Sequence, residues 1–460
     1  AGETLAIRTI RPDGSVYEPI RANTGEFRMP GLTPGALVEH SFRRREGAAG
    51  FQYSNGPFYF MDPGLAEPFW LSRWVLLIHE DAPVTVIERN LRRRGMKHTQ
   101  TKRGEWIVHV YEARNMPRVE PEPPAPDRDE FLPWIKVLES RTLDQLDGPY
   151  RERTLVGKAP APSVVAKAKE LVQGVTGAQA QALKLLDFVH EHVRDQGNAA
   201  RPEQVLAARA GSKLNLLLGL LEAAEIPHDL ILAGASPYAS KPTDWDHPEP
   251  GQFSIPLVRI SPTSQDEQPL FLFPFAHRLA PRTKLPFQLW GAPAYACEAG
   301  GGAPLVLPRG DLEDEGARAR LRLKLGPDGS AEGSIAEEVR RFGSYGFKEQ
   351  LSRAQDNQLR QFFAQRVSRM FPGANLLGYG LPGVEEQGVP LRWRLKFQAP
   401  QVVSRRGDGA LVLHGLLTPS QLTPQLGSRQ RRIFDLVLES PVLNRQVTEV
   451  ELGPFACPNP

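Results

Sequence analysis

Cysteine is scarce in this chain: only Cys297 and Cys457 occur among its 460 residues. No CxxC pair is present, so the zinc and redox motifs built on that spacing are missing. One disulfide between the two cysteines would close a long loop and contribute about 4–5 kcal/mol in the chain-entropy model. Two separate thiols are the equal alternative, so the number of cysteines does not identify the compartment.

Long apolar runs are also missing. No stretch of 18 apolar residues occurs, so we expect no transmembrane helix. The first ten residues contain no signal-peptide pattern and resemble the inside of a β domain, so any secretory signal was removed or lies upstream. Neither sign of charge dominates, because 56 basic residues face 53 acidic ones, a net charge of +3. That balance gives no indication of a nucleic-acid or membrane-surface partner.

Motifs for metals and cofactors do not occur. The chain has no HExxH sequence and no phosphate-binding glycine loop, and the glycine-rich segment Ala299–Ala303 is typical of a flexible tip. His190 and His192 flank Glu191, but adjacent residues of a helix point apart and do not make a metal site. We therefore expect no metal and no cofactor.

The length suits about three domains, and 40% apolar residues can supply their cores. Residues 1–155 have the pattern of a β-sandwich, with strands on both sides of the turn Pro12–Gly14. Trp74–His79 is predicted as a buried strand, and Lys102–Glu105 as a hairpin turn. The proline-rich segment 121–126 is predicted as an extended spacer.

Residues 156–310 show helical periodicity first and strand-like runs afterwards, which favours an α+β domain. The strongest stripe is formed by Leu214, Leu217, Leu218 and Leu221. Leu216 and Leu220 add apolar side chains on other faces, so we expect this helix to be buried nearly all round.

Residues 311–460 return to β structure. Residues 317–325 and 391–397 alternate strictly between apolar and basic residues, as half-buried strands do. One helix is predicted near 346–371, ending before Pro372. The exposed rows of Arg and Lys are interpreted as a solvated sheet face, with an acidic partner as the alternative.

Several segments resemble the bacterial transglutaminase-like family that carries an N-terminal domain of the DUF3857 type. In the first domain the PDG turn is followed by the phrase Met29-Pro30-Gly31-Leu32-Thr33-Pro34-Gly35. In the second, the helix ending in Val193-Arg194, the lead-in Pro202–Leu206 and the segment Leu220–Pro227 are similar to family patterns. The resemblance covers most of the chain and is strongest over 181–310, while the first domain lacks the family's opening strands.

The resemblance implies a multidomain α+β fold. Residues 1–155 form a DUF3857-like β-sandwich, and 156–310 a transglutaminase-like (papain-like) core. Residues 311–460 then form a C-terminal β-sandwich with one long helix.

Active members of this family place a cysteine nucleophile in Gly-Asp-Cys at the N-terminus of the buried helix, where the helix dipole stabilises a thiolate. Here that stretch, residues 209–215, reads RAGSKLN and is about three residues short. One alignment register places Lys213 at the cysteine position and the other places Ala210 there, so neither supplies a thiol. Ser212 is predicted to be the helix N-cap, with a serine nucleophile as the alternative.

The base and the orienting acid are missing as well. The family's F-x-H strand corresponds to Gln252–Val258, with Ile255 at the histidine position. Its LDPT sequence corresponds to Leu272–Phe275, and we assign Pro274 as the replacement for the aspartate. Loss of all three residues removes the activated nucleophile and its base.

Other residues are weak substitutes. His247 and Asp246 lie in a polar loop and could form a compensating pair, although such a loop is more often a solvated turn. His277 is expected at the surface, and Cys297 lacks both a helix N-terminus and a paired histidine.

We therefore expect a non-catalytic pseudo-transglutaminase that binds or assembles with other proteins or peptides. One alternative is a glycan- or cell-wall-binding module that uses exposed indoles, for which the candidates are Trp70, Trp74, Trp245 and Trp290. The other is a residual amidase in which Ser212 and His247 lie within hydrogen-bond reach. Relatives with this architecture are exported in Gram-negative bacteria, so the resemblance implies the periplasm or the cell surface.

Overall fold

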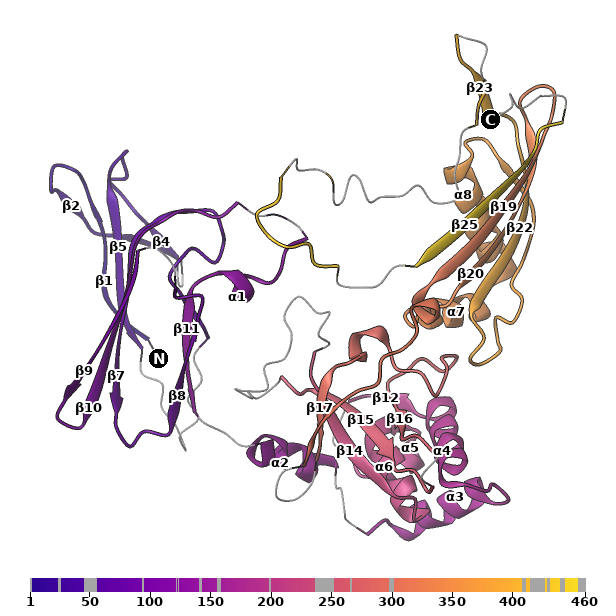
Figure 1. The fold of residues 1–460 in the computed structure, drawn as a ribbon, viewed down its shortest axis with the longest axis horizontal. Coiled ribbons are helices and arrows are strands. Elements are labelled where there is room, and N and C mark those ends of the chain that lie inside the picture. Colours follow the sequence, from indigo (N-terminus) through magenta and orange to yellow (C-terminus); the bar gives the residue numbers. More distant parts are fainter. Residues whose placement is uncertain are drawn as a thin grey trace.

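The computed structural model describes residues 2–23, 26–44, 56–92, 95–120, 122, 124–139, 143–154, 159–197, 200–235, 252–264, 267–297, 302–407, 411–413, 427, 431–438 and 443–453. The chain is a mixed α+β protein with several antiparallel sheets, arranged as three units in sequence order (Figure 1). Within the described ranges every helix is too short or too polar to cross a bilayer.

The first unit consists of antiparallel sheets. One has the order β2-β1-β5, from Val16–Tyr17, Gly2–Ile10 and Leu37–Arg44. The second has the order β7-β10-β9, from Phe69–His79, Trp106–Met116 and Met96–Arg103. The third has the order β6-β11-β8, from Phe58–Tyr59, Trp134–Glu139 and Val84–Arg89. A small ribbon pairs β3 (Ile20–Asn23) with β4 (Glu26–Arg28), and the short helix α1 (Arg128–Phe131) precedes β11.

The core of this unit lies between the second and third sheets, where Phe60 and Tyr111 are completely buried. Both predicted turns are confirmed. Thr9 faces Tyr17 across the PDG turn, and Arg103 faces Trp106 across the hairpin loop. The prediction that Trp74–His79 is buried is wrong for alternate residues, since Val75 and Leu77 are about half exposed. They lie on the outer face of β7, an edge strand of its sheet, while Trp74 on the inner face packs in the core.

The second unit has helices followed by a sheet. Its helices are α2 (Leu143–Thr154), α3 (Pro162–Val172), α4 (Ala178–His192), α5 (Pro202–Ala208) and α6 (Lys213–Ala223). The sheet order is β16-β15-β14-β17-β18, from Leu270–Leu272, Ile255–Ile260, His228–Ala233, Pro293–Ala296 and Pro304–Val306. All of its neighbouring strands are antiparallel.

Helix α6 is buried nearly all round, as predicted, with Leu214, Leu216, Leu217, Leu218, Leu220 and Leu221 all in the core. The predicted domain boundary at 155 is displaced, because α2 contacts α6 and its Tyr150 packs against the same core. The second unit therefore begins at α2. The helix carries few apolar residues, so its own periodicity gave no indication of this docking.

The third unit is built on one five-stranded sheet of order β21-β22-β20-β19-β25, from Asn375–Gly380, Leu391–Ala399, Ala331–Val339, Ala317–Leu325 and Asn444–Glu451. Strand β25 runs parallel to β19, and the other pairs are antiparallel. The short strands β23 (Val403–Arg405) and β24 (Leu411–Leu413) form a separate ribbon.

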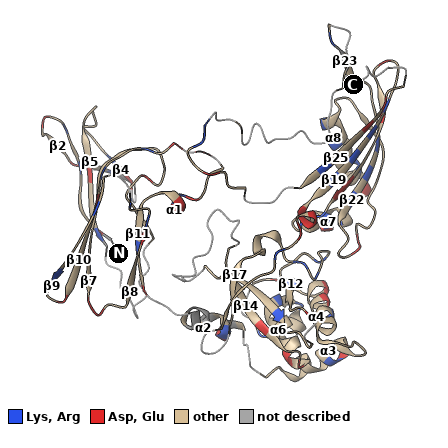
Figure 2. Ribbon diagram, viewed as in Figure 1, with Lys and Arg blue, Asp and Glu red and all other residues tan. Residues whose placement is uncertain are grey.

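The predicted C-terminal β-sandwich with one long helix is corrected. The apolar face of the sheet packs against two helices, α7 (Ser344–Arg353) and α8 (Asp356–Met370), rather than a second large sheet. The helix breaks because Ala354 is extended and Gln355 begins α8 with a capping box to Gln358. The basic face is solvated, as predicted, and Figure 2 shows basic and acidic residues together on the strands of this sheet. Its cations pair with neighbouring carboxylates, for example Arg322 with Glu449.

A segment from the third unit reaches the first unit. Arg432 donates to the carbonyls of Glu122 and Pro124, and the Glu122 carboxylate accepts the backbone N–H groups of Ile433 and Phe434. In Figure 1 this yellow segment lies beside α1. The predicted spacer is therefore the place where the segment around Arg432 contacts the first unit, and Glu122 is almost fully buried there.

Candidate binding site at the N-terminus of helix α6

The N-terminus of α6 is fixed by local structure. Ser212 is the N-cap, as predicted, and its hydroxyl accepts the backbone N–H of Asn215 at 3.2 Å. The preceding strand β13 (Ala210–Gly211) pairs in parallel with β12 (Arg194–Asp195), which directly follows α4. Gly211 has a φ of +136°, a conformation that favours glycine. This ribbon holds the start of α6 beside the end of α4.

A pocket of about 500 Å³ opens at this point. It is lined by the end of α4, by β12, by the start of α6, by the segment after β16 and by α7 of the third unit. The lining residues are His190, Glu191, His192, Val193, Arg194, Asp195, Arg209, Lys213, Phe275, Ala276, His277, Arg278, Glu349 and Arg353. The start of α6 is thus part of the wall of a pocket shared by two units.

Lys213 is the first residue of α6 and lines this pocket. Burial lowers the pKa of its amine, and Arg282 adds to the effect, while the charges of Asp195 and Glu349 oppose it. In the described part of the chain no carboxylate lies within 4 Å of this amine. Lys213 is therefore a partly desolvated cation that forms no ion pair with any residue the structure describes.

His190 on α4 lines the same pocket and is only 4% exposed. Neither of its ring nitrogens has a hydrogen-bond partner among the described residues. Burial, then the positive charges of Arg282 and Lys213, lower the pKa of His190 to about 3. The nearby peptide groups of Phe273 and Ala276 raise the pKa and offset part of this shift, but neither forms a hydrogen bond with the ring. The imidazole is neutral at physiological pH.

Arg282 connects the parts of the site. Its guanidinium donates to Asp187 of α4 at 2.7 Å and to the carbonyls of His277, Arg278 and Ala280. The segment after β16 is thereby bound to α4. Gln387 of the third unit also donates to Asp187, at 3.1 Å.

The remaining predicted positions carry no acid–base group at this site. Ala210 lies in β13. Ile255 packs in a second core cluster with Leu257, on the opposite face of the sheet from α6, so its side chain does not occupy a position facing the helix. Pro274 is buried in the segment that follows β16.

Of the other candidate residues, His277 lines the pocket. His247 and Asp246 lie outside the described residues, as do Trp245 and Cys457. Cys297 is buried in the core, and its backbone N–H donates to the carbonyl of Leu230. His277 is about half exposed, as expected, and lies 3.6 Å from Glu349. His190, Arg282 and Glu349 were not predicted as site residues, because they meet at α6 only through the tertiary fold.

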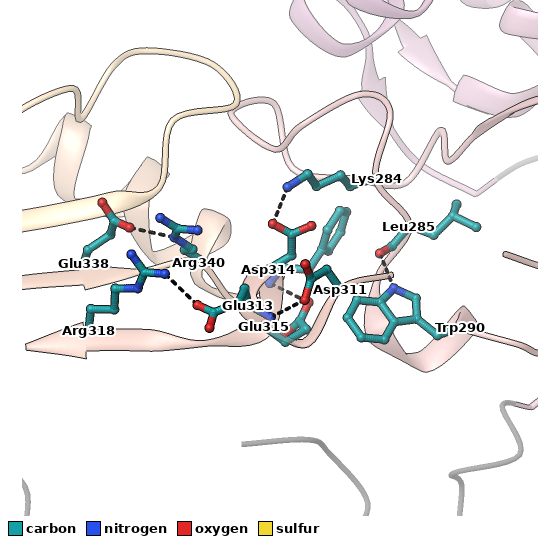
Figure 3. Close-up of polar contacts among 11 residues, drawn as sticks. Lys284, Leu285, Trp290, Asp311, Glu313, Asp314, Glu315, Arg318, Glu338 and Arg340 are labelled. Carbon is teal, nitrogen blue, oxygen red and sulfur yellow. Dashed lines mark hydrogen bonds and ion pairs between the residues drawn. The ribbon is translucent and has the colours of Figure 1, made fainter. Parts of the chain in front are cut away.

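A second pocket of about 320 Å³ lies between the sheet of the second unit and the third unit. Figure 3 shows that polar groups of this pocket are paired: Lys284 bonds Asp314, Arg340 bonds Glu338 beside the pocket, and Trp290 donates to the Leu285 carbonyl. Glu315 accepts the N–H of Phe342, and burial raises the pKa of Glu315. These contacts lie where the second and third units meet, and the groups that make them are already hydrogen-bonded within the protein.

The aromatic candidates for glycan binding are mostly internal. Trp290 is 5% exposed, and Trp74 stacks on Phe58 inside the first unit. Trp70 alone among the described candidates is well exposed, at 73%. The described residues contain no group of three His, Cys, Asp or Glu side chains that could hold a metal ion.

No family model matches this chain, and no curated protein matches it. Two solved structures are similar to it. One is a Parabacteroides distasonis protein classed provisionally as a protease: it is 11% identical, the match covers 87% of this chain and 83% of that one, and the TM-score is 0.45. The other is the periplasmic domain of TgpA from Pseudomonas aeruginosa, with 15% identity, 48% and 75% coverage and a TM-score of 0.20. These values are too low to assign the activity of either protein to this chain.

Proposed function

We propose that this chain is a non-catalytic transglutaminase-like protein that binds or assembles with proteins or peptides of a bacterial cell envelope. The contact site is the pocket at the N-terminus of α6. The observation that carries the proposal is the start of α6, where Lys213 or Ala210 stands at the family's thiol position and the neighbouring Ser212 hydroxyl is already used as a helix cap.

Acyl transfer requires a nucleophile within hydrogen-bond reach of a base. Among the described residues no histidine bonds the Ser212 hydroxyl, and the His190 ring makes no hydrogen bond. The pKa of His190, about 3, leaves a weak base at neutral pH. These features support binding over turnover at this position.

The envelope setting is part of the same proposal and rests on the resemblance of the sequence to exported proteins. Cell fractionation of the native host tests it. Recovery of the chain in the periplasmic or outer-surface fraction agrees with the proposal, and recovery in the cytoplasm contradicts it.

The binding role is tested by site-specific photo-crosslinking in the native host. A photoreactive residue in place of Arg353, at the pocket, should give a discrete adduct with a protein or peptide. The matched control is Lys324, an exposed position on the solvated face of the third unit. Adducts of equal yield from both positions, or none from Arg353, would contradict a contact site at α6.

A further inference from the structure

We infer that the pocket at the α6 N-terminus binds an oxyanion, a carboxylate or phosphate group carried by its ligand. Lys213 and His190 bind this group beside the first turn of α6. The inference rests on the proposed function in taking this pocket as the contact site, and it adds the chemistry that the site recognises.

The helix supplies the first part of the site. The first N–H groups of any α-helix lack intrahelical acceptors, and the N-terminus carries a partial positive charge. Helix α6 has 11 residues. The Ser212 hydroxyl accepts a hydrogen bond from the backbone N–H of Asn215, and the Ser212 carbonyl accepts one from the backbone N–H of Leu216. The N–H groups of Lys213 and Leu214 precede that first intrahelical bond.

The charges around the pocket favour an anion. Lys213, Arg194 and Arg209 line it without an ion pair in the described structure. The one carboxylate that faces them from the third unit, Glu349, is shared by His277 at 3.6 Å, Arg278 at 3.4 Å and Arg353 at 3.9 Å. Glu191 and Asp195 of the second unit also line the pocket, so five Lys and Arg side chains face three carboxylates. In the described structure none of these carboxylates lies within ion-pair distance of the Lys213 amine.

His190 is the independent observation. Buried polar groups are nearly always hydrogen-bonded, and leaving one without a partner is unfavourable. Neither ring nitrogen of this buried side chain has a hydrogen-bond partner among the described residues, although the side chain lines the pocket. A neutral imidazole has one N–H to donate, and an oxyanion oxygen is the strongest acceptor for it.

The test is calorimetric titration of the full chain with inorganic phosphate and, separately, with acetate, at constant ionic strength set by sodium chloride. Lys213→Met should weaken binding about tenfold or more, since it removes a charge-assisted hydrogen bond. Lys213→Arg should retain most of the affinity, and His190→Leu should weaken it. The control Lys324→Met, on the solvated face of the third unit, should bind as the wild type does.

The two anions distinguish the sources: tighter phosphate binding indicates a phosphorylated ligand, and tighter acetate binding indicates a peptide carboxylate. No binding of either anion up to about 10 mM by the wild-type chain overturns the inference. Binding that Lys213→Met and His190→Leu leave unchanged also overturns it. Either result leaves the non-catalytic role standing, because that role is judged by turnover and by photo-crosslinking.

Discussion

Replacing His190 by leucine should remove an acid sensitivity from the second unit. In the folded chain burial, Arg282 and Lys213 lower the pKa of His190 to about 3, whereas an unfolded histidine titrates near about 6.5. Below that value the unfolded chain binds a proton that the folded chain does not bind. Stability is therefore present above about pH 6.5 and is lost progressively as the pH falls toward about 3.

The size of the effect follows from the shift. Each pKa unit corresponds to about 1.4 kcal/mol, so between pH 7.5 and 5 the loss from this one group is about 2 kcal/mol. Over this pH interval the free energy of unfolding should therefore fall by about 2 kcal/mol less in His190→Leu than in the wild type. Leucine is apolar and suits a position flanked by the buried Leu186 and Val189.

The assay is calorimetric unfolding of the full chain at both pH values, following the transition that His190→Leu shifts. His192→Gln is the matched control, because His192 lies on the same helix but is exposed. It should show the pH dependence of the wild type. An identical loss of stability in the wild type and His190→Leu would refute the burial argument.

Two further predictions concern packing and the contact between the first and third units. In Gly219→Ala the new Cβ would lie 2.8 Å from the rigid ring of Pro202, so we expect α5 and α6 to separate and the unit to lose about 1–3 kcal/mol by urea unfolding. Gly148→Ala in α2 is its control, since that Cβ meets nothing within 4 Å and should be neutral or stabilising; a Gly219→Ala chain as stable as the wild type would contradict the contact. Glu122→Gln removes the charge that accepts the N–H groups of Ile433 and Phe434, so residues 431–438 should exchange amide hydrogens several-fold faster, about 1 kcal/mol less protected. Glu120→Gln, at an exposed neighbouring carboxylate, should leave that exchange unchanged, and equal rates in both variants would count against the docking.

Much of the fold is predictable where one periodicity dominates. The leucines of α6 predict a buried helix, and the alternation in 317–325 and 391–397 predicts strands that β19 and β22 confirm. The break between α7 and α8 is not predicted, because no proline or glycine stands at residues 353–355, where one helix ends and the next begins. The signal that could have revealed it is the pair Gln355 and Gln358, which forms a capping box.

The site is only half predictable. Ser212 and Lys213 follow from the resemblance, because they occupy a recognisable point at the start of a leucine-rich helix. His190 precedes Lys213 by 23 residues, and Glu349 belongs to the third unit. Only the tertiary fold brings their side chains to α6, and a buried histidine without a partner has no sequence signature.

The most direct measurement is turnover by the purified full chain of glutamine-containing peptides, followed as ammonia release and as incorporation of a fluorescent primary amine. The account predicts no rate above that of a Ser212→Ala, Lys213→Met double variant, with or without reductant. Release or cross-linking by the wild-type chain that this double variant loses would contradict it.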